Sequence, residues 1–309
     1  MDTPTATPPT APKRRLATLP DLDDDETDFD AMVVDENTDI NDLTPAQMYD
    51  LNQVLFTESV PSRPLIGEIA SLAELRAEYE DGSPNFVLQI DWLQKHGFHS
   101  LRRTKGDGDC FYRSTAFAFI EQLMNDAKPH VAVAHALSVL HSTLGMLTSV
   151  GFQSLVFDDF YDVFVAIIRN IVKPDQDKKI LTPARLLDAF QSPETSNSIV
   201  VYLRLVTSAQ MRLAADEYDG LLFHPETGEP MEVRTFCENF VEATGKEADH
   251  VQMTALARAL QINIDIAYMD GRSPDVSSVP LRGADDNVKP LILLYRPGHY
   301  DILMEPTTR

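Results

Sequence analysis

The chain has 309 residues, of which 43% are hydrophobic, and its formal net charge at pH 7 is −22. This length allows one large domain or two small ones, with a sizeable core. The negative charge counts against nucleic acid as a partner, because a phosphate backbone attracts clustered Lys and Arg, and the sequence offers only Lys13, Arg14 and Arg15. No apolar run approaches the roughly 18 residues of a membrane span, and the first residues lack the apolar centre of a signal peptide, so we expect no membrane partner either.

The two cysteines, Cys110 and Cys237, are too few for a disulfide framework in a chain of this length. They fit a reducing compartment, and we expect a cytoplasmic protein. The basic stretch at residues 12–15 (PKRR) has two interpretations. It is either a fragment of a nuclear import signal, which would add a nuclear location, or a few solvated charges, which is the commoner case.

The composition changes near residue 45. Residues 1–44 hold twelve acidic and three basic residues, a net charge of −9, and few apolar groups. Such a segment cannot bury enough apolar surface to offset the entropy lost on ordering. We therefore predict a disordered acidic tail over residues 1–44 and one folded catalytic domain over residues 45–309.

The first half of the folded domain has the apolar spacing of helices. Val87, Ile90, Trp92 and Leu93 recur with the helical period, and Gly97 ends that pattern. Further helices are predicted over residues 110–124, 131–147 and 160–172.

The second half begins with a long apolar helix over residues 196–218, with Ser196 or Ser198 as its N-cap. A short helix over residues 233–241 and a helix that begins after Asp249 follow. Alternating or continuous apolar residues then predict strands at residues 262–268, 289–295 and 299–304. Helices followed by strands predict an α+β or mixed α/β domain, with helices packed around a small sheet.

One of the two cysteines lies in the stretch GDGDCFYR, residues 106–113, where three interpretations compete. A calcium loop needs oxygen ligands at alternate positions, but Asp107 and Asp109 are followed at once by Cys110 and two aromatic residues. The sequence also lacks the Cys-x-x-Cys pair that is usual in zinc sites, so we expect no metal. A buried core cysteine is the common case, and it is the interpretation we give Cys237 in its apolar context RTFCENF.

The position of Cys110 favours a nucleophile instead. Gly106 and Gly108 allow a tight turn with converging backbone amides, and a helix is predicted to begin at Cys110. The positive end of a helix dipole lowers a thiol pKa, although the charge of Asp109 acts in the opposite direction. Exposed amides beside the sulfur would also stabilise an oxyanion during acyl transfer.

A thiol nucleophile needs a base, usually histidine, and a group that orients it. Among the eight histidines, His299 differs from the others because it follows a turn and opens a strand in PGHYDIL. Side chains alternate along a strand, so His299 and Asp301 share one face while Tyr300 points away. Asp301 can then fix the tautomer of His299 and leave the other ring nitrogen free.

The stretches GDGDCFYRS and LLYRPGHYDIL closely resemble the otubain branch of the ovarian-tumour family of cysteine deubiquitinases. VVYLRLVTS, FCENFVE, GKEADHVQMTALARAL and IAYMDG resemble otubain segments in the same order, so the resemblance covers residues 62–304. It implies a papain-like cysteine protease fold and a nucleophile at Cys110. It also implies a general base at His299, an orienting acid at Asp301, and at Asp107 an aspartate whose backbone helps to build the oxyanion hole.

The resemblance further implies hydrolysis of ubiquitin chains or conjugates without a cofactor, and a preference for the chain linkage that marks proteins for the proteasome. Ubiquitin, polyubiquitin and ubiquitin-conjugating E2 enzymes are the expected partners. Two alternatives stay open: a binder that sequesters ubiquitin-charged E2 enzymes without using its thiol, and a hydrolase of a ubiquitin-like modifier.

This sequence departs from the family pattern at two positions of the cysteine loop. Asp109 stands where asparagine is usual, and Gly106 where proline is common. The extra charge of Asp109 is expected to raise the thiol pKa or to alter the closure of the loop. The segment before residue 45 has no clear match in the family.

Overall fold

The fold is built on one six-stranded sheet. The computed structural model describes residues 63–305 with the exception of residues 219 and 226, so the tail predicted for residues 1–44 lies outside the described residues. The strand order is β1-β2-β6-β5-β3-β4, in which β3 runs parallel to β5 and the other registered pairs are antiparallel. The strands are β1 (Ile66–Ser71), β2 (Ser100–Thr104), β3 (Asn263–Tyr268), β4 (Ser277–Arg282), β5 (Leu291–Arg296) and β6 (His299–Leu303).

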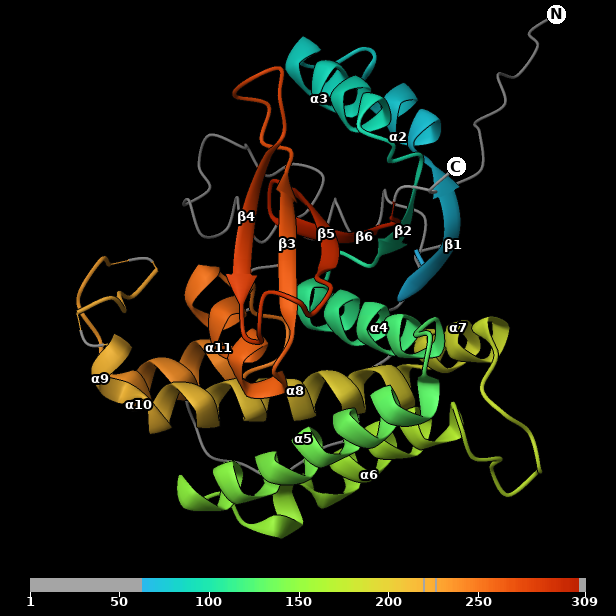
Figure 1. The fold of residues 1–309 in the computed structure, drawn as a ribbon. Coiled ribbons are helices and arrows are strands. Elements are labelled where there is room, and N and C mark those ends of the chain that lie inside the picture. Colours follow the sequence, from blue (N-terminus) through green and yellow to red (C-terminus); the bar gives the residue numbers. More distant parts are fainter. Residues whose placement is uncertain (1–62, 219, 226, 306–309) are drawn as a thin grey trace, which may run out of the picture. The chain divides into compact units, whose positions relative to one another are not determined.

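Helices pack on both faces of this sheet (Figure 1). They are α2 (Leu72–Tyr79), α3 (Pro84–Lys95), α4 (Cys110–Met124), α5 (Pro129–Ser149), α6 (Ser154–Asn170), α7 (Pro183–Gln191), α8 (Pro193–Leu213), α9 (Ala215–Tyr218), α10 (Val233–Phe236), the π-helical turn η2 (Cys237–Val241) and α11 (His250–Leu260).

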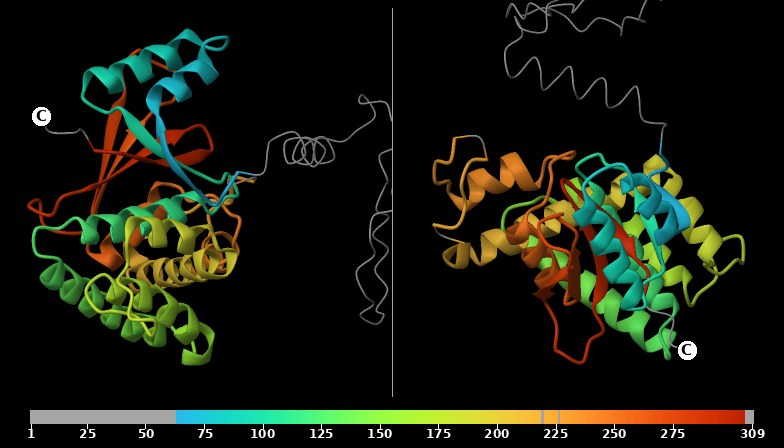
Figure 2. Two further views of the ribbon diagram at one scale, coloured as in Figure 1. Left: turned by 90° about the vertical axis from the view of Figure 1, so that its right-hand side faces the viewer. Right: turned by 90° about the horizontal axis from the view of Figure 1, so that it is seen from above.

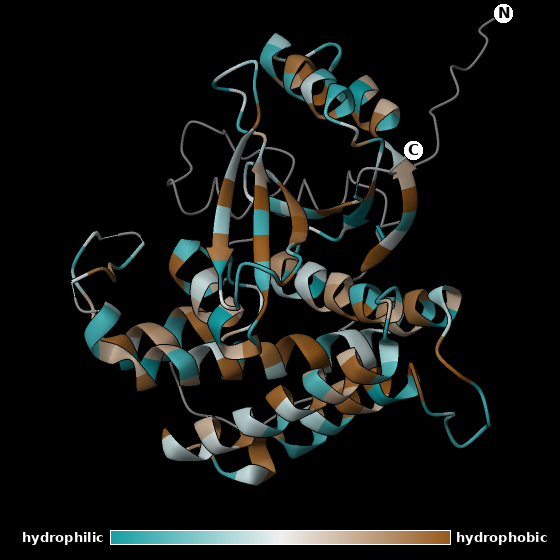
Figure 3. Cartoon of the chain, viewed as in Figure 1, coloured by the Kyte–Doolittle hydropathy of each residue, from teal (hydrophilic) through white to brown (hydrophobic). Residues whose placement is uncertain are grey.

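The pleat of the strands divides the apolar residues between two cores. On β5 and β6, Leu293 and Ile302 belong to the larger core on the side of α4, α8 and α11, whereas Leu294 and Leu303 pack with α2 and α3. Figures 1 and 2 show these two helical layers on opposite sides of the strands. Strongly hydrophobic residues follow β3, β5 and the middle of α8 (Figure 3), where the larger core lies.

Helix α4 lies between the sheet and α8, and its bounds agree with the predicted range of 110–124. Every residue from Cys110 to Ile120 is buried, because β5 and β6 cover one side of the helix and α8 covers another. Its first residue is Cys110, so the fold places the thiol at the N-terminus of its most buried helix, beside β6.

The remaining predictions from apolar spacing are largely confirmed. Helices α3 and α5 cover their predicted ranges, and α6, β3, β5 and β6 overlap theirs with slightly different ends. The long helix predicted over residues 196–218 is wrong at its C-terminal end, because α8 stops at Leu213 and residues 215–218 form the separate helix α9. Asp249 caps α11 as expected: its side chain accepts from the amide of Val251, and Gln252 completes a capping box.

Other expectations were wrong. Strands β1, β2 and β4 and helices α2 and α7 were not predicted, so strands are not confined to the C-terminal part. Strand β2 (SLRRT) does not have the apolar pattern of a buried strand, because one of its buried side chains is Arg102, which forms an ion pair with Glu121. Helix α8 begins after Ser192, one turn before Ser196, because Pro193 suits the first helical turn.

Helix α5 corrects one further expectation. Among the described helices it alone is long and apolar enough to cross a membrane by length and composition, since it carries no Asp, Glu, Lys or Arg. In this fold it packs against α6 and α8, and it buries Val133, Leu140 and Leu147 in the larger core. A core helix of a folded domain satisfies the same test, so its apolar character is weak evidence for a membrane span.

Candidate active site

The cysteine loop, residues 105–109, joins β2 to α4 and delivers Cys110 to the start of the helix. Gly108 adopts a positive φ of 75°, which an L side chain rarely adopts. The Asp107 carboxylate organises the turn: Oδ1 accepts from the amide of Asp109 at 3.1 Å, and Oδ2 accepts from Nη2 of Arg113 at 2.9 Å. Because Arg113 is buried on α4, this ion pair fixes the turn to the helix that carries the thiol.

The two β6 residues predicted to act together do lie together. His299 Nε2 is 2.8 Å from Oδ1 of Asp301, as expected for side chains on one face of a strand. The other ring nitrogen, Nδ1, is buried and has no hydrogen-bond partner. It faces the cysteine loop, since a Cβ atom built on Gly106 would be 3.5 Å from it. His299 thus has one oriented nitrogen and one free nitrogen beside the loop.

Asp301 is completely buried and its carboxylate is fully engaged. Oδ1 also accepts from the backbone amide of Thr104 at 2.9 Å, while Oδ2 accepts from Nε and Nη2 of Arg296 at 3.0 and 2.7 Å. Burial acts to raise the pKa of Asp301, but the hydrogen bond from His299 and the charge of Arg296 outweigh it and lower the pKa. The carboxylate is therefore ionised at neutral pH, as a group that orients an imidazole must be.

Arg296 was missed in the sequence, although a signal for it exists. The hairpin between β5 and β6 pairs Arg296 directly with His299. A two-residue turn at residues 297–298, read together with the strand alternation, predicts this pairing. The sequence could not show that Arg296 bonds the carboxylate of Asp301, because that contact depends on how the β5–β6 hairpin packs in the fold.

Cys110 lies in a more enclosed place than the sequence suggested, with a relative exposure of 3%. Burial raises the pKa of its thiol to about 12, a backbone hydrogen bond at Tyr300 partly offsets this, and the charges of Asp107, Glu247 and Asp301 add to it. The expected lowering by the helix N-terminus is therefore outweighed. The raised pKa favours the neutral thiol over the thiolate at neutral pH.

The charge of Asp109 is paired, which the sequence did not reveal. Arg204, completely buried on α8, donates to Oδ1 of Asp109 from Nε at 2.9 Å and from Nη2 at 2.5 Å. Asp109 does not cap α4 with its side chain. The aspartate at this unusual position is thus half of a buried ion pair between the cysteine loop and α8.

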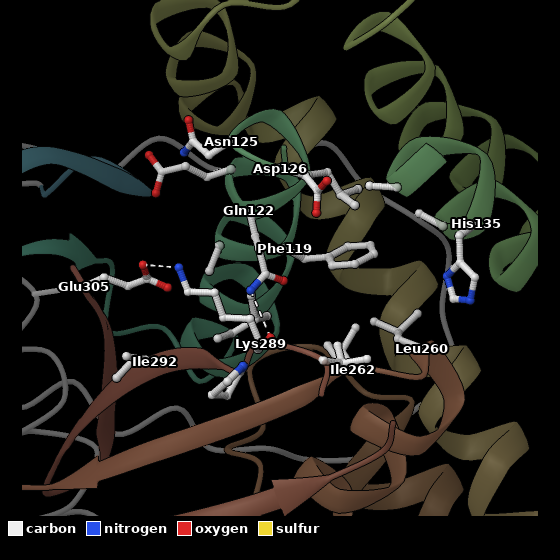
Figure 4. A pocket seen from close by; sticks show the side chains of 18 of the residues that line it. Phe119, Gln122, Asn125, Asp126, His135, Leu260, Ile262, Lys289, Ile292 and Glu305 are labelled. Carbon is white, nitrogen blue, oxygen red and sulfur yellow. Dashed lines mark hydrogen bonds and ion pairs between the residues drawn. The ribbon is translucent and has the colours of Figure 1, made fainter. Parts of the chain in front are cut away.

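A pocket of about 840 Å³ lies elsewhere, around the C-terminal part of α4 (Figure 4). Phe119, Leu260 and Ile262 form part of its lining, and Lys289 forms an ion pair with Glu305 at its edge. None of the four predicted site residues lines this pocket. The groups able to perform chemistry gather instead at the opposite end of α4, where the thiol is enclosed by its own loops.

The fold and this arrangement are typical of a cysteine peptidase: the thiol at the N-terminus of α4 has a backbone hydrogen bond at Tyr300, and the preceding residue, His299, is oriented by the carboxylate of Asp301. The model of the family described as Peptidase C65 Otubain matches residues 58–305. The chain therefore belongs to the otubain family of cysteine peptidases, and the family and the enzyme class predicted from the sequence are confirmed.

Curated relatives agree with this assignment over most of their length. The chain is 33% identical to ubiquitin thioesterase OTUB1 of Homo sapiens over 246 residues, which is 80% of this chain and 85% of the relative. It is 31% identical to the ovarian tumor domain-containing deubiquitinating enzyme 1 of Arabidopsis thaliana over 260 residues, covering 80% and 82%. It is 32% identical to ubiquitin thioesterase OTUB2 of Mus musculus over 237 residues, covering 76% and 94%.

Solved structures of OTUB1 complexes share the fold. One contains h/ceOTUB1, ubiquitin aldehyde and UBCH5B~Ub; the TM-score is 0.68 at 26% identity, covering 84% of this chain and 95% of the other. A second contains h/ceOTUB1, ubiquitin aldehyde and UBC13~Ub, with a TM-score of 0.70 at 25% identity, covering 84% and 97%. The predicted helix-and-sheet fold of the papain-like type is confirmed by these matches.

Proposed function

We propose that the chain is a deubiquitinase that hydrolyses the isopeptide bond after the C-terminal glycine of ubiquitin, with Cys110 as nucleophile and His299 as general base. The relatives named as ubiquitin thioesterases and the OTUB1 complexes that contain ubiquitin support the substrate. The observation that carries the proposed roles is the pairing of His299 Nε2 with Asp301, which leaves a free Nδ1 facing the cysteine loop.

Acylation begins with the neutral thiol. As the sulfur attacks the carbonyl carbon of the ubiquitin glycine, its proton passes to Nδ1 of His299. Asp301 accepts from Nε2 throughout, so it stabilises the imidazolium that forms. Backbone amides of the cysteine loop hold the oxyanion of the tetrahedral intermediate. Those of Gly108 and Cys110 are the donors, because the amide of Asp107, predicted to contribute, donates to the carbonyl of Lys105 at 3.1 Å and that of Asp109 donates to Oδ1 of Asp107. His299 then gives the proton to the lysine amine, which leaves as the C–N bond breaks and a thioester forms.

Deacylation uses the same groups in a second cycle. His299 takes a proton from water, the resulting oxygen nucleophile attacks the thioester carbon, and the C–S bond breaks. The thiol of Cys110 regains its proton from His299, and ubiquitin leaves with a free C-terminal carboxylate. Neither half-reaction requires a metal or an organic cofactor, since all proton transfers use His299.

An experiment on the two cysteines tests this proposal. Ubiquitin that carries an electrophile at its C-terminus should attach to Cys110 and leave Cys237 unmodified. Burial raises the pKa of both thiols to about 12, so their own acidity does not distinguish them. Only a bound ubiquitin places the electrophile within about 3–3.5 Å of one sulfur. Peptide mapping of the adduct, repeated with Cys110→Ser, decides the site; an adduct on Cys237 would contradict it.

A second function is favoured by the complexes that hold UBCH5B~Ub and UBC13~Ub on OTUB1 chains. This chain would bind ubiquitin-charged E2 enzymes, and such binding does not need the thiol. Cys110→Ala separates the two functions: it should abolish turnover of diubiquitin and leave the affinity for a charged E2 unchanged. Loss of both would contradict independent binding.

The preferred chain linkage belongs to the same proposal. We expect the linkage that marks proteins for the proteasome to be cleaved faster than the others, and ubiquitin to be preferred over ubiquitin-like modifiers. Initial rates on a panel of diubiquitins and of modifier–peptide fusions at equal concentration measure both preferences. Equal rates across the panel would remove the linkage preference and leave the hydrolase assignment intact.

A further inference from the structure

We infer that Arg204 and Asp109 are positioning residues, which hold the segment of residues 242–249 against the cysteine loop and thereby set the backbone amides beside Cys110. The kinetic part of this inference rests on the proposed function, whereas the contacts themselves are properties of the fold. Arg204 is completely buried and Asp109 is nearly so, and we therefore assign both side chains a role inside the fold, without contact to substrate.

The guanidinium of Arg204 joins three stretches of chain. Besides the two bonds to Asp109, Nη1 donates to the carbonyl of Val241 at 3.0 Å, at the end of the π-helical turn. Nη2 also donates to the carbonyls of Gly108 at 3.2 Å and Lys246 at 2.6 Å. The group stacks on the ring of Tyr112, with 4.3 Å between its Cζ and the ring centroid. A planar group with five N–H donors suits this arrangement, and a lysine could not reproduce it.

Asp109 adds a direct bond between the same stretches. Its Oδ1 accepts from the backbone amide of Gly245 at 3.0 Å, in addition to the two bonds from Arg204. The two backbones also touch, since a Cβ atom on Gly108 would lie 2.2 Å from the carbonyl oxygen of Gly245. Residues 244–247 are exposed to solvent on their other side. The buried ion pair therefore attaches an exposed segment directly to the loop that presents the thiol.

The same segment reaches the histidine side of the site. A Cβ atom on Gly298, in the turn before His299, would lie 3.4 Å from Oε1 of Glu247. The charge of Glu247 also acts on the thiol of Cys110. One segment thus approaches both the cysteine loop and the histidine turn.

The chemical consequence concerns the oxyanion more than the thiol. Preorganised amides stabilise charge that develops in the transition state, and removal of one such donor costs roughly 10²–10³ in kcat. Release of the 242–249 segment would let the turn at Gly108 relax and would misdirect these amides. The thiol would remain at the start of α4, because that helix is buried along its whole first part.

The experiment compares two reactions of Cys110 in full-length enzyme. Hydrolysis of ubiquitin with a fluorogenic C-terminal amide needs the oxyanion amides, whereas alkylation by iodoacetamide does not. Asp109→Ala should lower kcat about tenfold or more, with KM within about threefold of wild type and no fall in the alkylation rate. Asp109→Asn keeps the acceptor oxygen and should restore kcat to within about threefold of wild type.

Glu121→Gln serves as the matched control. It weakens a second largely buried ion pair on α4, to Arg102 at 3.3 Å, at the far end of the helix from Cys110. It should lower Tm and leave kcat unchanged. The inference is overturned if kcat of Asp109→Ala stays within about twofold of wild type. It is also overturned if kcat and alkylation fall together, or if Asp109→Asn is as slow as Asp109→Ala.

Hydrogen exchange provides a test that needs no activity and no alanine variant. Arg204→Lys should speed exchange of the amides of residues 108–110 and of Gly245 by about tenfold or more, while those of β6 exchange at the wild-type rate. Unchanged exchange in the loop would overturn the inference. If wild-type enzyme cleaves no ubiquitin substrate, the proposed function fails, and exchange alone still decides whether the ion pair holds the segment.

Discussion

The two cysteines are buried to a similar extent, but the residues around them differ. Cys110 and Cys237 are 3% and 0% exposed, and burial raises the pKa of each thiol to about 12. The sulfur of Cys237 donates a weak hydrogen bond to the carbonyl of Ser208 at 3.9 Å, within the small core of α10 and η2. Cys110 instead lies below a glycine turn and beside the strand that carries His299.

This difference shows where reactivity comes from in this fold. The thiol pKa does not distinguish the proposed nucleophile from Cys237, because burial raises the pKa of both thiols. In the proposed function, what distinguishes Cys110 is the His299–Asp301 pair on β6, as proton acceptor, and a loop of backbone amides. Reactivity is thus expected to depend on the residues around the thiol. Substitutions of those residues should lower the rate, and substitutions around Cys237 should not.

The largest effect is expected from exchanging the two thiols for alanine. Cys110→Ala should reduce kcat for diubiquitin by about 10⁴-fold or more, because no other group replaces the nucleophile. Cys237→Ala should leave kcat within about threefold and lower only Tm, through a small cavity. Steady-state kinetics and thermal unfolding of both variants measure this. Comparable losses of kcat would remove the distinction between the two regions.

A smaller effect is expected along the chain of proton-handling groups. His299→Ala should lower kcat by roughly 10³–10⁴, because the thiol proton then has no acceptor. Asp301→Asn should lower it by about 10², since the base remains and only its orientation and charge stabilisation are lost. Their kcat values on one diubiquitin substrate give the order. An Asp301→Asn enzyme at the wild-type rate would exclude Asp301 as the orienting group.

The burial of Asp301 also predicts a stability effect that Cys237 lacks. Asp301→Ala leaves Arg296 without its partner and should cost about 3–5 kcal/mol of unfolding free energy. Because the folded state lowers the pKa of Asp301, its contribution is complete above the ordinary aspartate pKa of about 4 and is lost as pH falls through the lowered value. Urea unfolding of wild type and Asp301→Asn between pH 3 and 6 should converge toward the acid end.

At alkaline pH the two cysteines should behave alike. The folded state raises both thiol pKa values to about 12 from 9.0, so each contributes stability below pH 9 that is lost as pH rises toward 12. In this range the free energy of unfolding should fall by about 1 kcal/mol per pH unit for each thiol. Cys110→Ala and Cys237→Ala should each flatten the decline between pH 9 and 11 by a similar amount. A flattening by Cys237→Ala alone would mean that Cys110 ionises readily in the folded enzyme.

The smallest effect is expected from deleting residues 1–44, which lie outside the described residues. If the comparison of the two cysteines is complete within the folded domain, the deletion should change kcat for diubiquitin by less than about twofold and leave Tm unchanged. A loss of about tenfold, equivalent to roughly 1.4 kcal/mol in the barrier, would mean that the acidic segment contributes to substrate binding or to the site.

Local chemistry made part of this structure predictable from the sequence. Apolar spacing located α4, α5 and α11, because a helix that packs on one side carries its period in the sequence. Strand alternation placed His299 and Asp301 on one face, and the glycines of residues 106–108 marked the turn before Cys110. Strand β2 was not predicted, because its buried Arg102 is stabilised by an ion pair with Glu121. Such a contact between distant residues does not appear in the local apolar pattern.

Only the tertiary structure decided the state of the site. The sequence suggested an accessible thiol with a lowered pKa, but the sheet and the loops over Cys110 bury it, and desolvation outweighs the helix dipole. In the sequence Asp109 has no neighbouring cation, whereas in the fold it pairs with Arg204, 95 residues further along the chain. A buried charge is stable only beside an opposite charge. Which residue supplies that charge depends on tertiary packing, so the residues near Asp109 in the sequence do not indicate its partner.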